Sequence, residues 1–538
     1  MCGISRHVFI ALIGSLLIAG IAGGAGEGRL ATGEAAVEAR RLDEAEHAFQ
    51  SVLTSSGYPE DNSAEIASAL LGMARVRLEQ HCLEEAFELA GAGKAMREKL
   101  FGKQAAPVGE SCRLLAQIAL ARGELNEADE MAARSLEILI AAGKEESIEI
   151  PACLDVLAAT AVERGHMDEA LLLTERALKM RRQALPELHE DVALSLNNMA
   201  VVLQAQGHYG RAEKNAEHAL LLWRKLEGPQ PEGLVRCLSS LGVIYAAEER
   251  FDAAIKMHEN AISLAEEVFG ESDPEVAACL ESMGLTYLQK NATDRAASLF
   301  SRALRIREAK LGADHLSVVT PLQHLGHIEL RKGNPADAVR SLQRALSIKE
   351  EAVGCDQPSL CPILTDLARA FHQQQKYDEA EPLYLRAMAM LERAYGKRDP
   401  ILVSRFDQLR AFYQEQALYE KAVSFSKRTI KLLEDLLGSD HRSVGWQRRN
   451  LGRLYVELDQ FEAAEQEFLR AIEILDQPDA PPDMQLVLSL EEYARLLDRI
   501  GRRERAESLR ERAEEIRERL SPGGRRITPP TRSGERND

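Results

Sequence analysis

The chain has 538 residues, of which 45% are hydrophobic and 5% aromatic, and its formal net charge is −18. This negative charge excludes a general nucleic-acid-binding protein, which would present a basic stripe to the phosphates. The composition, rich in alanine, leucine and glutamate, is typical of an all-helical chain with enough apolar surface for a continuous core.

The first 26 residues carry the pattern of a secretory signal peptide. A short polar start at Arg6 and His7 precedes a mostly apolar run from Val8 to Ile21, and small residues follow that run. The run is short for a membrane span, which needs about 20 residues. We therefore expect residues 1–26 to be a signal peptide and the mature protein to be exported, periplasmic or extracellular. An uncleaved N-terminal membrane anchor is the alternative.

One pattern recurs from Leu42 to the end of the helical region. Segments that resemble the stretch beginning at Tyr377 follow one another at steps of 42 residues, except for a first step of 41. A fixed period with one invariant position indicates a repeat protein, whose units contact mainly their neighbours. We place this array at residues 27–520. The invariant position, three after each start, holds Ala45, Ala86, Ala128, Ala170, Ala212, Ala254, Ala296, Ala338, Ala380, Ala422, Ala464 and Ala506.

Each repeat is predicted to be a pair of helices. In the repeat Val192–Leu222, apolar residues recur at helical spacing until Gly207, and a second helix begins after Tyr209. Glycine at this turn can adopt the left-handed conformation that ends a helix. Neither helix can bury its apolar face alone, so the repeats must stack. The alanine column lets the two helices of a repeat approach closely, because a larger side chain would force them apart.

The cysteines suggest packing positions more than bridges. Cys153, Cys237 and Cys279 share one column that small residues fill in other repeats, which favours a packing slot between helices. Cys355 and Cys361 lie in one loop between repeats and are the one pair that we would test for a disulfide.

The residues that repeat identify a family resemblance. First helices carry a large residue, a glycine or alanine, and then an aromatic residue, as in Leu241-Gly242 with Tyr245. Second helices carry alanine, an aromatic residue and alanine, as in Ala296, Phe300 and Ala303. This pattern resembles the tetratricopeptide repeat, and its 42-residue period is similar to the long-helix type of kinesin light chains. The resemblance implies an all-α fold, a right-handed superhelical solenoid of about twelve stacked helix-turn-helix repeats.

The resemblance also implies where a partner would bind. In this family the first helices line a concave groove that holds a protein segment or peptide. The position two before the small residue is polar in eight successive repeats, and a polar column on an otherwise buried helix is expected to face a solvated groove. That column holds Asn198, Ser240, Ser282, His324, Asp366, Gln408, Asn450 and Glu492, and the position after the small residue adds His327, Arg369, Arg453 and Arg495.

One first helix gathers an aromatic residue and two arginines on one face. Trp446, Arg449, Asn450 and Arg453 follow the spacing i, i+3, i+4, i+7, which suits an acidic or aromatic peptide. A solvated polar surface without a dedicated ligand is the competing interpretation. The asparagine pair with which kinesin light chains hold a peptide is complete only at Asn197-Asn198, so kinesin cargo recognition is not transferred. The candidate groove residues are Asn197, Asn198, His324, His327, Asp366, Arg369, Gln408, Trp446, Arg449, Asn450 and Arg453.

No catalytic, cofactor or metal site is predicted. The segment Gly91–Lys94 lacks the first glycine and the Ser/Thr of a phosphate loop, and His324 with His327 lack a third ligand in the sequence. No stretch outside the repeats is long enough for an enzyme domain, and residues 521–538 are expected to form a disordered tail. We therefore expect a non-catalytic scaffold that binds a protein or peptide and no nucleic acid. The alternatives are a membrane-anchored structural or assembly factor of the cell envelope and an enzyme with an unrecognised site.

Overall fold

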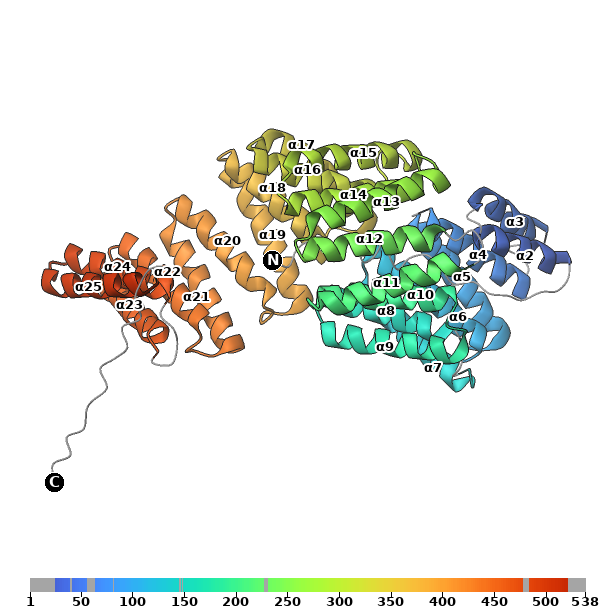
Figure 1. Cartoon of the computed structure of the whole chain (residues 1–538), viewed down its shortest axis with the longest axis horizontal. Helices are drawn as coiled ribbons and strands as arrows, with labels where there is room; N and C mark the ends of the chain where they lie inside the picture. Colours follow the sequence, from blue (N-terminus) through green and yellow to red (C-terminus); the bar gives the residue numbers. More distant parts are fainter. Residues whose placement is uncertain are drawn as a thin grey trace, which may run out of the picture. The chain divides into compact units, whose positions relative to one another are not determined.

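The structure is a computed structural model that describes residues 25–520, apart from residues 39–40, 56–62, 81, 145–146, 148, 227–230 and 478–482. This part of the chain is all-α and contains no strand (Figure 1). The first helices of the repeats are α2 (Ala25–Glu38), α4 (Ala64–Glu79), α6 (Ala106–Arg122), α8 (Glu149–Arg164), α10 (Glu190–Ala205), α12 (Pro231–Ala247), α14 (Pro274–Gln289), α16 (Val319–Lys332), α18 (Cys361–Gln373), α20 (Ile401–Glu415), α22 (Arg442–Glu457) and α24 (Met484–Arg499).

Each first helix packs against the second helix that follows it, so the described helices form the expected helix-turn-helix repeats. Two 3-10 turns, η1 (Leu316–Val318) and η2 (Pro358–Leu360), precede α16 and α18. The second helices are α3 (Leu42–Ser55), α5 (Leu83–Phe101), α7 (Leu125–Ala141), α9 (Met167–Ala184), α11 (Tyr209–Lys225), α13 (Phe251–Phe269), α15 (Thr293–Leu311), α17 (Pro335–Val353), α19 (Tyr377–Tyr395), α21 (Tyr419–Leu437), α23 (Phe461–Leu475) and α25 (Arg503–Leu520).

The array divides into two compact units, the first ending at Cys355 and the second beginning at Asp356. Within each unit, successive repeats stack so that a second helix also contacts the first helix of the next repeat. The first helix of the first repeat begins at Ala25, two residues before the predicted start of the array at residue 27. The predicted signal peptide, apart from its last residues, and the predicted tail lie outside the described residues. None of the helices that the structure places combines the length and hydropathy needed to cross a membrane.

The alanine column explains how closely the helices of a repeat pack. All twelve of its alanines are fully buried, with no exposed surface, from Ala45 in α3 to Ala506 in α25. Because the column recurs on every second helix, each repeat has the same closest point of approach. The prediction of a stacked array built on this column is confirmed.

At a second column, a glycine on the first helix makes room for a large side chain on the second helix in two neighbouring repeats. The ring of Phe300 packs over Gly284, where an added Cβ would lie 2.9 Å from the ring. His258 lies over Gly242 in the same way in the preceding repeat, and there a Cβ would lie 2.5 Å from the imidazole. Where the first helix carries Ala200 instead, the facing residue is the small Ala216. A large side chain on α13 or α15 therefore depends on a glycine on the helix that faces it.

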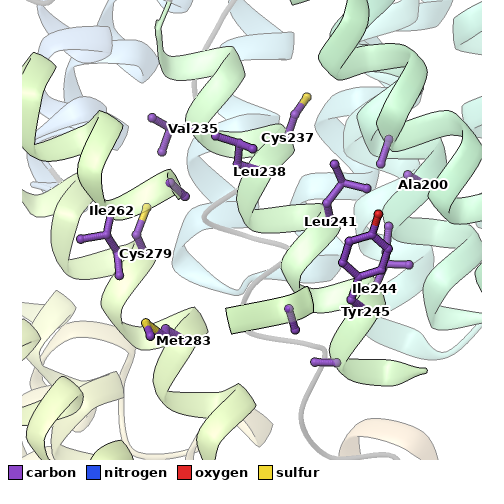
Figure 2. Packing of buried hydrophobic residues seen from close by; sticks show 14 of the residues in the cluster. Ala200, Val235, Cys237, Leu238, Leu241, Ile244, Tyr245, Ile262, Cys279 and Met283 are labelled. Carbon is purple, nitrogen blue, oxygen red and sulfur yellow. The ribbon is translucent and has the colours of Figure 1, made fainter. Parts of the chain in front are cut away.

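The core of the first unit is continuous from α9 to α16. Figure 2 shows Cys237, Leu241 and Tyr245 along α12, with Cys279 and Met283 on α14. Burial raises the pKa of the Cys237 thiol to about 12, so this cysteine is an apolar packing group at neutral pH. The packing interpretation of the cysteine column is confirmed for these buried residues.

Histidine side chains cap the N-termini of the helical segments that begin several repeats. The Nδ1 atom of His189 accepts a hydrogen bond from the backbone N–H of Asp191 at 3.1 Å. His315 and His441 accept in the same way from the N–H groups of Ser317 and Ser443, both at 3.2 Å. These histidines therefore replace the Asp or Ser that usually caps a helix, which accounts for them structurally.

The turn between the helices of a repeat takes the left-handed conformation whatever residue occupies it. Gly207 has φ of 80°, and Ala417, at the same position before α21, has φ of 56°. Because the left-handed region is unfavourable for alanine, Ala417→Gly should stabilise the second unit by about 1 kcal/mol. Ala411→Gly, in the middle of α20, should instead destabilise it by about 1 kcal/mol. Urea unfolding of both variants checks this, and equal destabilisation would contradict it.

His258 should make stability depend on pH. Burial lowers the pKa of its fully buried imidazole from 6.5 to about 4, while Nε2 lies 3.1 Å from Thr286 Oγ1. The unfolded chain therefore takes up the proton first as the pH falls below 6.5. Stability present at neutral pH is lost in this window, by roughly 2–3 kcal/mol at pH about 4.5.

The His258→Phe variant is the matched comparison, because Phe300 occupies the equivalent position over Gly284. Thr286 Oγ1 also donates a hydrogen bond to the carbonyl of Ser282 at 3.3 Å, so the hydroxyl retains a partner when the imidazole is removed. Urea unfolding at pH 7 and at pH 4.5 should show a smaller loss in the variant than in the wild type. Equal losses in the two proteins would refute the assignment to His258.

Candidate functional site

The predicted polar column does not lie in a solvated groove along its whole length. Asn198 and Asn450 are buried, with exposed fractions of 4% and 8%, and Ser240 and Ser282 are buried as well. The reason is that the first helices pack on one another as well as on their partners, as α10 does on α12 and α22 on α24. The prediction that these four residues face solvent is wrong.

The asparagine pair that resembles the peptide-holding motif is also internal. Asn197 is buried, and neither polar atom of its side-chain amide has a hydrogen-bond partner in the structure. The amide of Asn198 donates to Asp155 Oδ1 on α8 at 3.4 Å. Neither side chain is placed to hold the backbone of a peptide, which corrects the expectation that both line the groove.

The two histidine candidates form no metal site. The ring of His324 stacks on Phe300, with 4.7 Å between the ring centroids, so it continues the core of the repeat. His327 lies one turn later on α16 and is half-buried. Among the residues that the structure describes, no group of three potential ligands could hold a metal ion.

The candidates on α18 and α20 are half-buried and engaged by arginines of their own helices. Asp366 pairs with Arg369 at 3.0 Å. Gln408 Oε1 accepts a hydrogen bond from Arg405 Nη1 at 2.9 Å. These groups are accessible on the first helices of the second unit, and their charges are balanced locally. Cys361 is buried at the start of α18, whereas Cys355 is exposed, and their disulfide stays a prediction.

The strongest cluster lies where α22 meets α24. Glu492 on α24 faces two arginines of α22: its carboxylate oxygens lie 3.7 Å from Arg449 Nε and 3.6 Å from Arg453 Nε. Both distances exceed hydrogen-bond range, so the carboxylate is surrounded by guanidinium groups without being held by them. Burial raises the pKa of Glu492, and Arg449, Arg453 and Arg495 lower it in turn. We call these four residues the arginine cluster.

Arg449 is the buried member of the arginine cluster, with an exposed fraction of 6%. Its Nε and Nη1 atoms are buried and have no hydrogen-bond partner, while Nη2 donates to Asn450 Oδ1 at 3.5 Å. The amide of Asn450 donates to Gln447, whose own amide donates to Asp407 on α20 at 2.8 Å. This chain of hydrogen bonds links Arg449 to α20, the preceding first helix.

Of the four residues predicted to share one face of α22, two are therefore exposed and two are buried. Trp446 is 43% exposed and Arg453 is exposed, whereas Arg449 and Asn450 are buried beneath them. The sequence did not single out Gln447 or Asp407, which orient Arg449. Asp407 shares a repeat column with Arg449, and that shared register was the signal available for it.

A tetratricopeptide repeat family model matches residues 191–259, 238–309, 293–351, 317–393 and 408–477, and a second model of the same description matches residues 152–191. Together these matches span residues 152–393 and 408–477, more than half of the chain. No curated protein matches the sequence.

Three solved structures are similar to this chain at low identity. BtubC (BKLC) from P. vanneervenii is 20% identical with a TM-score of 0.38, covering 43% of this chain and 92% of its own. A putative kinesin light chain with nearly identical repeats from Podospora anserina is 18% identical with a TM-score of 0.33, covering 38% and 97%. The apo form of RapI is 12% identical with a TM-score of 0.41, covering 77% and 98%.

Proposed function

Because the chain belongs to the tetratricopeptide repeat family, we propose that it is a non-catalytic scaffold that binds a protein partner through its first helices. Repeats of this kind supply a long surface built from equivalent positions, on which single repeats can carry distinct side chains. No catalytic constellation among the described residues competes with this function, and the first helices of the second unit carry the best-defined polar cluster.

The arginine cluster is the observation that supports this proposal. Three guanidinium groups surround the single carboxylate of Glu492, which leaves an excess of two positive charges in a chain whose net charge is −18. Arg449 has buried N–H groups without a partner, and a buried donor without a partner is unfavourable by about 1–3 kcal/mol. A carboxylate from a partner protein would pair with the exposed guanidinium groups of Arg453 and Arg495 and offset the excess charge.

Trp446 supplies the apolar half of the same site. It lies one turn before Arg449 and Asn450 on α22, and nearly half of its surface is exposed. Tryptophan and arginine are the residues that most often dominate protein interfaces, because they bury large areas and form directed hydrogen bonds. The proposed partner segment therefore carries an acidic residue next to an apolar or aromatic one.

We expect Arg453→Ala/Arg495→Ala to weaken partner binding by about 10-fold or more, because two accessible guanidinium groups are removed. Both residues are exposed, so folding should be preserved. The measurement is a crosslinked pull-down from the native host, followed by titration of the purified partner. Lys427→Ala/Lys431→Ala on α21 removes the same charge from a second helix and is the matched control. Equal recovery of the partner by both double variants would exclude the arginine cluster as the binding site.

A further inference from the structure

Ion pairs join the second helices of successive repeats at one fixed register. A carboxylate near the end of one second helix pairs with an arginine 36 residues later on the next one. In the Glu308–Arg344 pair, Arg344 Nη1 lies 2.7 Å from Glu308 Oε1. These pairs, which we call the carboxylate–arginine ladder, are Glu266–Arg302, Glu308–Arg344, Glu392–Arg428 and Asp476–Arg512.

The ladder is interrupted at α9 and α11, where its carboxylates are missing. The carboxylate position holds Arg182 on α9 and Arg224 on α11, and the arginine position of α9 still holds Arg176. The helix α9 therefore carries the arginine of the ladder without an acid, whereas α11 has His218 at the arginine position. Glu187 takes over part of the role, since it lies 3.0 Å from Arg182 and 3.6 Å from His218.

Four exposed cations on these helices have no partner. Arg176, Lys179, Arg224 and Lys225 form neither an ion pair nor a side-chain hydrogen bond with any residue that the structure describes. In the ladder, by contrast, the arginines equivalent to Arg176 pair with a carboxylate from the preceding repeat. These helices thus carry unpaired positive charges on a protein that is negative overall.

Exposed leucines lie among these cations. Leu172 on α9 is 67% exposed and lies one turn before Arg176, and Leu221 on α11 is 48% exposed and lies one turn before Arg224 and Lys225. A shallow depression beside them is lined by apolar Leu178 and Met199 and rimmed by charged side chains. We define the α9–α11 patch as Leu172, Arg176, Lys179, Arg182, Leu221, Arg224 and Lys225; α9 and α11 lie in the first unit (Figure 1).

We propose that the α9–α11 patch docks an acidic amphipathic segment of a partner protein. The carboxylates of that segment would pair with the cations of the patch, as Glu266 and Glu308 pair with arginines in the ladder, and its apolar side chains would cover the exposed leucines. The patch is built from second helices, so it is a docking surface separate from the first-helix site proposed above. It goes beyond that function by giving the scaffold a second, chemically defined point of attachment.

Charge and composition favour a protein segment over other anionic partners. Glu175, Glu187 and Glu217 are interspersed with the cations, and the whole chain carries a net charge of −18. The interspersed glutamates repel an extended polyanion, such as a nucleic acid or an anionic membrane, whose charges cannot avoid them. A short peptide can place its carboxylates opposite single cations and avoid those glutamates.

The test is fluorescence anisotropy of the full-length protein with a labelled synthetic helical peptide that carries glutamates on one face and leucines on the next. Wild-type protein should bind it, more weakly as salt rises. Lys179→Glu/Lys225→Glu should weaken binding by about 10-fold or more, because two cations become like charges to the peptide. Both side chains are exposed and unpaired, so the variant should fold.

Arg305→Glu/Lys310→Glu on α15 is the matched control, since Arg305 occupies the position there that Lys179 occupies on α9. It should bind the peptide as the wild type does. Equal weakening in the two double variants would overturn the proposal. So would equal binding of a peptide with glutamine in place of glutamate, or preferential, variant-sensitive binding to phosphatidylserine vesicles. None of these outcomes depends on the arginine cluster.

Discussion

Asp155→Ala should lower the stability of the first unit by about 3–5 kcal/mol, because it leaves Arg181 buried without its carboxylate. Arg181 has no exposed surface, and its Nη2 lies 2.7 Å from Asp155 Oδ2 while its Nη1 donates to Ser195 Oγ at 2.5 Å. A guanidinium remains charged at any accessible pH, so it cannot avoid the loss by deprotonation. Urea unfolding at neutral pH measures the effect.

The control comes from another repeat of the same chain. Thr365 and Leu391 occupy, on α18 and α19, the positions of Asp155 and Arg181, and both are buried there. Asp155→Thr/Arg181→Leu should therefore stay within about 1–2 kcal/mol of the wild type, since the guanidinium and its carboxylate are removed together and Asp191 keeps His189 at 3.7 Å. If the double variant is as unstable as Asp155→Ala, the loss arises from packing and the ion-pair explanation fails.

Phe300→Ala should lower stability by about 3–5 kcal/mol, because it opens a cavity between α14 and α15. Phe300 has no exposed surface; its ring covers Gly284 and stacks on His324. The loss should appear in urea unfolding followed by far-ultraviolet circular dichroism.

A double-mutant cycle separates the fit of this pair from its hydrophobicity. Gly284→Ala should destabilise the wild type, because its Cβ would lie 2.9 Å from the ring of Phe300. In the Phe300→Ala background the same change should be tolerated, since Ala200 and Ala216 form the equivalent pair two repeats earlier. Strictly additive losses would show that the two positions do not constrain each other.

The candidate site was only partly predictable from the sequence. Helical spacing correctly placed Trp446 and Arg453 at the surface of α22, and it drew attention to Arg449 beside them. It could not show that Arg449 and Asn450 are buried, because burial depends on the packing of α24 against α22. Glu492 was found only as a polar entry of its column. Its position between the arginines of the preceding repeat depends on side-chain directions, which spacing along one helix does not report.

The basis of the fold lies in the sequence itself, because a period fixes local structure. The invariant alanines, the glycines at the turns and the apolar spacing made each repeat a helix pair that has to stack, and all twelve alanines are buried. Tertiary structure alone decided which polar residues became internal, as Asn197 and Asn198 did. It also decided which ion pairs formed across repeats and where the ladder was left without its acids. Those outcomes depend on distances between helices that are far apart in the chain, and a one-dimensional pattern does not contain them.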